Sequence, residues 1–149
     1  MNSNLSDRNL IDIDRTALDR ELCRHPGDLL RASEVRTLLD DRMQNLKQDL
    51  VEEKRKHELL QAQLQLEYRL TFEDSGRKVT ETAIQSYIIS DPRYQTSQAM
   101  YSRLERDILA ANTELSKSEN ELNALKIKGH MLRDLTALYT ANYFSTDAR

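Results

Sequence analysis

The stretch RKVTETAIQSYIISDPRYQ, residues 77–95, decides the fold because it differs from both of its flanks. It is rich in β-branched and aromatic residues, it follows Gly76, and it contains Pro92. The chain on either side is dense in Leu, Glu, Gln, Lys and Arg, which is typical of long helices. The sequence therefore predicts two long helices that are interrupted by a connector over residues 74–91.

The connector has recognisable start and stop signals. Asp74-Ser75-Gly76 has the composition of a turn. Thr80 has the chemistry to cap a short helix that begins with Glu81. Asp91-Pro92 is typical of an N-cap followed by proline at the first helical position. We therefore expect a turn, a short helix and a sharp restart.

The first long helix is expected over residues 28–73, where apolar residues recur at steps of three and four, as in a coiled coil. Glu53 and His57 interrupt this seam. Between Leu64 and Phe72 the pattern fits a strand as well as a helix. We expect a helix there, with a small β-hairpin over 64–80 as the alternative. The seam residues are Leu39, Met43, Leu46, Leu50, Leu60 and Leu64.

The second long helix is expected over residues 92–142. Its seam keeps the 3, 4 spacing for more than five heptads, which is a specific signal for a helix packed along its length. The seam residues are Tyr101, Leu104, Ile108, Ala111, Leu115, Ser118, Leu122, Leu125, Gly129, Leu132, Thr136 and Tyr139.

The N-terminal part is predicted to contain a flexible arm over residues 1–12 and a short helix over 14–25. Asp14 would cap this helix, and His25-Pro26-Gly27 would end it. Asp28 or Ser33 would then cap the first long helix. The predicted fold is all-α: an antiparallel helical hairpin in a single domain over 13–146.

Self-assembly is expected because the apolar face widens near the C-terminus, beyond what one neighbouring helix would cover. Copies of the same chain are the natural partners for such leftover apolar edges. The predicted oligomer contacts are Met131, Leu132, Leu135, Leu138, Tyr139 and Tyr143.

Charge and motif content narrow the function classes. The net charge is -3, so the chain has no overall basic character that would indicate nucleic acid. The single cysteine, Cys23, fits a reducing compartment. The N-terminus lacks the features of a signal peptide, and no apolar run reaches the length of a membrane span. We expect a cytoplasmic protein that is not an enzyme and has no metal or cofactor, since no catalytic or phosphate-loop motif is present.

Three local features could carry binding. The third, Lys126, Lys128 and Arg133 near the C-terminus, is more often a set of surface charges around an oligomer seam than a ligand site. The other two are the candidates for nucleic-acid binding. The first is a basic cluster that could follow a phosphate backbone. The second combines a cation with an aromatic ring, as single-strand binding proteins do. The alternative for the basic cluster is a solvated helix face that is paired with Glu52, Glu53 and Glu58. The alternative for the aromatic ring is a tyrosine that packs in the coiled-coil seam. The candidates are Lys54, Arg55, Lys56, Arg69, Arg77 and Lys78, then Arg93 and Tyr94.

Five short motifs follow one another along residues 12–146. They are Ile13-Asp14-Arg15-Thr16-Ala17-Leu18, Glu67-Tyr68-Arg69, Val79-Thr80-Glu81-Thr82-Ala83-Ile84, Asp91-Pro92-Arg93-Tyr94-Gln95 and Tyr143-Phe144-Ser145. Their order resembles the phage recombination mediators of the UvsY type.

The resemblance implies a homo-oligomeric ring, here of about six to eight subunits. It also implies binding to single-stranded DNA and the loading of a RecA-like recombinase onto DNA coated with single-strand-binding protein. In the family pattern, basic residues near the end of the first long helix contact DNA. Gln61 and Gln63 stand near those positions here, which makes Lys54, Arg55, Lys56 and Arg69 the nearest substitutes.

A second hypothesis from a different class is a coiled-coil scaffold, adaptor or prefoldin-like assembly protein. The acidic balance and the long heptads fit this function equally well. The discriminating feature would be a basic face, and the sequence contains only part of one.

Overall fold

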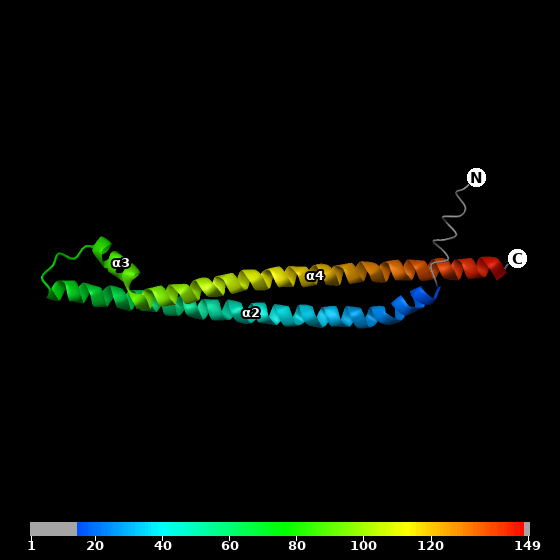
Figure 1. The fold of residues 1–149 in the computed structure, drawn as a ribbon, viewed down its shortest axis with the longest axis horizontal. Helices are drawn as coiled ribbons and strands as arrows, with labels where there is room; N and C mark the ends of the chain where they lie inside the picture. Colours follow the sequence, from blue (N-terminus) through cyan, green and yellow to red (C-terminus); the bar gives the residue numbers. More distant parts are fainter. Residues whose placement is uncertain (1–14, 148–149) are drawn as a thin grey trace, which may run out of the picture. The chain divides into compact units, whose positions relative to one another are not determined.

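A computed structural model describes residues 15–147, with side chains up to residue 141, and confirms the all-α class (Figure 1). The helices are α2 (Arg15–Asp74), α3 (Glu81–Ser90) and α4 (Pro92–Asp147). Within 15–147 there is no strand, so the β-hairpin alternative for residues 64–80 is wrong. The predicted arm and Asp14 lie outside the described residues.

The predicted helix break at His25-Pro26-Gly27 is also wrong, because α2 continues through Pro26. Proline removes one backbone hydrogen bond and crowds the preceding turn, which normally ends or kinks a helix. The first turns of α2 curve in Figure 1. Packing explains why the helix continues through the proline. One face of α2 stays partly or fully buried on both sides of Pro26, and it carries Leu18, Leu22, His25, Leu29 and Ala32. Asp28 and Ser33 therefore lie inside α2 and cap nothing.

The connector is as the sequence predicts. Gly76 has a φ of 67°, a left-handed conformation that suits glycine after a helix end. The Arg77 N–H donates to the Phe72 carbonyl at 3.2 Å and closes the end of α2. The Thr80 side chain accepts a hydrogen bond from the Ala83 N–H, so Thr80 is the N-cap of α3. The first residue of α4 is Pro92.

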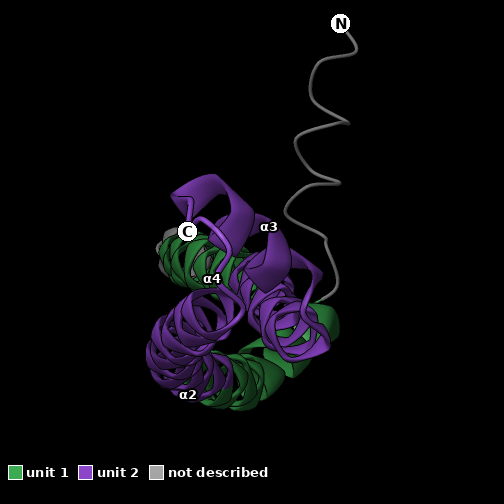
Figure 2. Ribbon diagram, turned by 90° about the vertical axis from the view of Figure 1, so that its left-hand side faces the viewer, with its two compact units in different colours: residues 1–38, 115–149 green, residues 39–114 purple. Residues whose placement is uncertain are grey.

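The chain divides into two compact units, whereas the sequence predicted one helical domain (Figure 2). Unit 1 combines residues up to Leu38 with residues from Leu115 onwards, and unit 2 is Leu39–Glu114. Both α2 and α4 contribute to each unit.

In unit 1, segments of α2 and α4 pack side by side in opposite directions. Lys128 Nζ lies 2.6 Å from a Glu21 carboxylate oxygen, and Arg36 lies 3.2 Å from Glu119. His25 packs against Gly129 so closely that a Cβ on the glycine would come within 2.6 Å of the His25 Nε2 atom. The predicted seam position Gly129 thus provides room for a ring from the facing helix.

In unit 2, the α2 and α4 segments also run antiparallel, and α3 adds a third layer. Arg42 pairs with Glu114 at 3.7 Å, and His57 Nδ1 lies 2.8 Å from Ser97 Oγ. The fully buried side chains of Leu64, Ile84 and Ile88 form the core. Partly buried residues pack around this cluster: Leu60, Tyr68, Phe72, Val79 and Tyr94.

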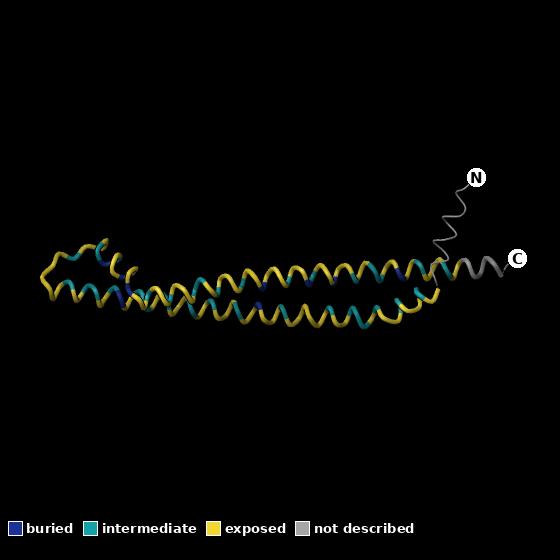
Figure 3. Tube along the Cα trace, viewed as in Figure 1, coloured by how far each residue is buried: buried dark blue, intermediate teal, exposed yellow. Residues whose placement is uncertain are grey.

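Burial follows the predicted seams (Figure 3). All six predicted seam residues of the first long helix, Leu39 to Leu64, are buried or half-buried, and so are those of the second from Tyr101 to Leu132. Glu53 and His57, which seemed to interrupt the α2 seam, are half-buried within it. The heptad spacing therefore continues through polar residues and forms one packing face.

Candidate nucleic-acid interface

The predicted binding residues near α3 are organised by Asp91, the residue that joins α3 to α4. Its N–H donates to the Ile88 carbonyl at 3.1 Å and ends α3. Its Oδ1 accepts the Arg93 backbone N–H at 2.8 Å and so caps α4. The Tyr68 hydroxyl donates to Oδ2 at 2.7 Å. The carboxylate is buried and is satisfied on both oxygens.

This network changes the pKa of each member. Hydrogen bonds from the Arg93 side chain and then from Tyr68 lower the pKa of Asp91 from 3.8 to about 2. The same bond to Asp91 raises the pKa of Tyr68. Asp91 and Glu67 raise the pKa of Arg93, whose guanidinium lies 2.9 Å from Glu67. Arg93 is thus held by two carboxylates and serves the joint between α3 and α4.

Three of the predicted cations make ion pairs with carboxylates. Arg93 pairs with Glu67 and Asp91, and Arg69 pairs with Glu81 on α3. Lys56 lies 3.5 Å from both Glu52 and Glu53, and these carboxylates raise its pKa. A phosphate would have to compete with the carboxylate already present at each of these side chains.

Tyr94 is half-buried and packs against His57, with 4.9 Å between the ring centroids. Tyr101 stacks on the same imidazole, with 6.2 Å between the ring centroids. The packed interpretation of these tyrosines is the one that the geometry supports, because a ring used inside the seam is not free to stack on a base.

The remaining predicted cations are exposed. Lys54, Arg55, Arg77 and Lys78 have no ion pair with any described residue. Lys47, which sequence reasoning missed, is also exposed and makes no ion pair within the described part of the chain. Its spacing of seven residues from Lys54 was the available signal, since residues seven apart share a helix face. These five side chains of unit 2 are free to contact phosphate.

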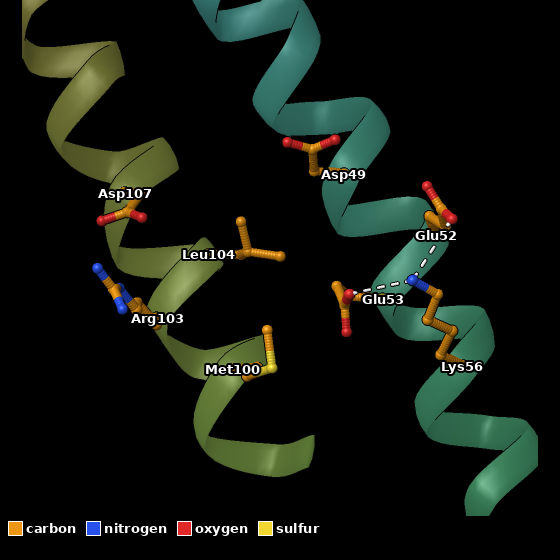
Figure 4. Close-up of a pocket in the computed structure, with 8 residues that line it drawn as sticks. All are labelled: Asp49, Glu52, Glu53, Lys56, Met100, Arg103, Leu104 and Asp107. Carbon is orange, nitrogen blue, oxygen red and sulfur yellow. Dashed lines mark hydrogen bonds and ion pairs between the residues drawn. The ribbon is translucent and has the colours of Figure 1, made fainter. Parts of the chain in front are cut away.

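A pocket of about 470 Å³ lies beside Lys56 in unit 2, between α2 and α4 (Figure 4). Met100 and Leu104 point from α4 toward α2, while Lys56 turns back to the two carboxylates of its own helix. Four carboxylates and two cations line the pocket, so its potential opposes a phosphate at Lys56. The lining residues are Asp49, Glu52, Glu53, Lys56, Met100, Arg103, Leu104 and Asp107.

The predicted oligomer contacts separate into two groups. Met131 and Leu138 are exposed and remain available to a partner. Leu132 is buried within unit 1, and Leu135 and Tyr139 are half-buried. Leu132 therefore packs inside the chain, which leaves little of its side chain for a second copy. Tyr143 lies outside the residues whose side chains are described.

The described residues contain no group of three or more His, Cys, Asp or Glu side chains that could hold a metal ion. None of the described helices is long and apolar enough to cross a membrane. No protein-family model matches the chain, and no curated protein or solved structure matches it.

Proposed function

We propose that the chain is a recombination mediator that binds single-stranded DNA and helps a RecA-like recombinase displace single-strand-binding protein. The resemblance to UvsY-type proteins over residues 12–146 motivates this function. The observation that carries it is the set of exposed cations in unit 2 without a carboxylate partner. Lys47 and Lys54 share a face of α2, and Arg77 and Lys78 follow its C-terminal turn.

A few cations per chain provide only weak binding to phosphate, and the net charge of -3 does not add to it. Repetition of these cations in a homo-oligomer would convert weak contacts into avidity, because each later contact is intramolecular. A ring of about six to eight copies would supply such repetition. The mechanism thus needs assembly more than it needs a strongly basic chain.

Fluorescence anisotropy with labelled oligo-dT tests the proposal. The variant Lys54→Ala/Arg77→Ala/Lys78→Ala should bind at least tenfold more weakly at low salt. The slope of log K against log salt should fall by about 2, since each lost single-strand phosphate contact removes about 0.7.

The matched control removes the same number of cations from unit 1. Lys117, Lys126 and Arg133 are exposed, without an ion pair to any described residue. Their triple alanine variant should bind like the original chain. Equal loss in both variants would show non-specific charge attraction, and equal affinity of all three proteins would remove the proposed patch.

A non-enzymatic scaffold or adaptor is the second candidate function. It is favoured by the ion pairs at Lys56, Arg69 and Arg93, because these three predicted phosphate-binding side chains already have carboxylate partners. Large apolar side chains that stay exposed, among them Leu38, Leu109 and Ile127, also suit protein partners. Native mass spectrometry with a single strand and a duplex separates the two functions, because a scaffold would form oligomers that retain neither nucleic acid. Strands over residues 64–80 would have favoured a prefoldin-like version, and the described structure has none there.

A further inference from the structure

Helix α2 carries a second apolar stripe in unit 2, made of Leu59, Gln63, Leu66 and Leu70 and named here the outer stripe. Its members are spaced 4, 3 and 4 residues apart, as in a coiled-coil seam. The three leucines are between 51% and 63% exposed. No described element covers them.

The outer stripe is separate from the seam that packs inside the chain. At 100° per residue, its centre lies roughly 120° around α2 from His57, Leu60 and Leu64. Those seam residues are buried or half-buried, whereas Leu59 and Leu66 are exposed. An α-helix with two apolar stripes of this spacing has room for a second helical neighbour.

The charges at the two ends of the outer stripe are opposite in sign. Arg55 and Lys56 precede Leu59 by four and three residues, and Glu73 and Asp74 follow Leu70 by three and four. Arg55, Glu73 and Asp74 are exposed and have no ion pair with any described residue. Lys56 makes only long contacts of 3.5 Å to Glu52 and Glu53.

The charges at the ends of the outer stripe are complementary to those of an identical helix that runs in the opposite direction. Arg55 and Glu73 are 18 residues apart, as are Lys56 and Asp74, which is five full turns. Each opposite-charge pair therefore lies along one side of the stripe. A two-fold axis perpendicular to two antiparallel helices brings the same side of both helices together.

We propose that a second copy of this chain docks antiparallel on the outer stripe through a two-fold axis. Leu59 then packs against Leu70 of the second copy, and Gln63 lies opposite Leu66. On the two sides, Arg55 pairs with Glu73 and Lys56 with Asp74 of the second copy. Each of these contacts occurs twice, as an isologous interface requires.

The occupant is a second copy because reversal of this one segment matches both apolar and charged positions. An unrelated helix would need the same spacing with the charge order fixed independently. The interface also gives Arg55 and Lys56 a role that differs from the predicted DNA contact. It shares with the proposed function only the need for more than one copy, and it leaves Lys47, Lys54 and Lys78 free.

Sedimentation velocity without nucleic acid tests the interface. The original chain should associate with rising concentration, and Leu66→Lys should weaken this association at least tenfold. Leu109→Lys, which changes a leucine that is 67% exposed on α4, is the matched control and should associate normally. A chain that stays monomeric up to on the order of 100 µM overturns the proposal, and so does a Leu66→Lys variant that associates normally.

A charge exchange tests the pairing itself. Arg55→Glu/Lys56→Glu and Glu73→Lys/Asp74→Lys should each associate more weakly alone, because like charges then face each other. Their mixture should form a hetero-dimer, since every facing pair is again opposite. Failure of the mixture to associate better than either variant would exclude this pairing.

Cross-linking tests the direction. In a Cys23→Ser background, a cysteine introduced as Gln63→Cys lies near the two-fold axis and should be joined to its copy by a short bismaleimide. A cysteine introduced as Leu70→Cys lies far from its own copy and should not be joined. Equal linkage at both positions indicates parallel packing and overturns the proposal. None of these readouts involves DNA, so their failure and that of the proposed function are distinguishable.

Discussion

Unit 2 has a fully buried core, while unit 1 has only a seam. Leu64, Ile84 and Ile88 in unit 2 have no exposed surface, because α3 covers the α2 and α4 segments there. In unit 1 the buried apolar residues are Leu18, Leu122 and Leu132, each of which keeps a little exposure. The difference shows that two paired helices bury a stripe, and that a third element of only ten residues is needed to close a core.

The largest expected effect is loss of the unit 2 core. Leu64→Ala should lower the free energy of unfolding by about 3–5 kcal/mol, because it removes buried methyl groups and leaves a cavity. Leu122→Ala, in the unit 1 seam, should cost about 2 kcal/mol or less, since its surroundings are open and can relax. Leu109→Ala should stay within about 0.5 kcal/mol as an exposed control. Urea denaturation followed by circular dichroism, at one protein concentration, measures the free energy of unfolding of all three variants. Equal losses of stability for Leu64→Ala and Leu122→Ala would contradict the comparison of the two units.

A smaller effect is expected at the contact between Gly129 and His25 in unit 1. Alanine usually stabilises a helix interior by about 1 kcal/mol relative to glycine. At Gly129 the new methyl would meet His25, so Gly129→Ala alone should bring no such gain. In a His25→Ala background the same change should add about 1 kcal/mol. A double-mutant cycle from thermal unfolding measures this coupling, and additive effects would show that the ring moves aside freely.

A third effect is confined to acid and concerns unit 2. The pKa of Asp91 is lowered to about 2 in the folded chain, below its ordinary value of 3.8. The unfolded chain therefore takes up the proton first as the pH falls. The stability that ionised Asp91 provides is complete above pH 3.8 and is lost as the pH falls through about 2.

Melting temperatures between about pH 5 and pH 2 should therefore fall more for the original chain than for Asp91→Asn. The asparagine keeps a capping oxygen but has no charge to lose. Parallel curves for the two proteins would mean that the bonds to Arg93 and Tyr68 contribute nothing that depends on the charge of Asp91.

Local chemistry made part of the fold predictable. Thr80, Gly76 and Pro92 each act through their own backbone neighbours, so the connector could be placed from the sequence. The seams could be predicted because leucine spacing reports the helix face directly. Pro26 misled the prediction, since the same seam spacing continues across it and long-range packing outweighs one lost hydrogen bond.

The candidate site was less predictable because ion pairs join residues that are distant in sequence. Arg93 and Glu67, or Arg69 and Glu81, belong to different helices, and only folding brings each pair together. The sequence could indicate the local pairs of Lys56 with Glu52 and Glu53, but not the pairs that join two helices. Lys47 could have been predicted from its spacing of seven residues from Lys54. The acidic pocket beside Lys56 could not, because its lining residues come from both α2 and α4.

Asp91 is the single residue between α3 and α4, so the junction of these helices contains no flexible loop. One residue ends the first helix and starts the second, and its carboxylate is held by Tyr68 of α2 and by Arg93 of α4. Helix α3 is therefore fixed at both ends, because Asp91 joins it to the first turn of α4 and Glu81 pairs with Arg69 of α2. A partner that binds the exposed Ile89 would act on α2 and α4 through these contacts, with no flexible loop between α3 and α4.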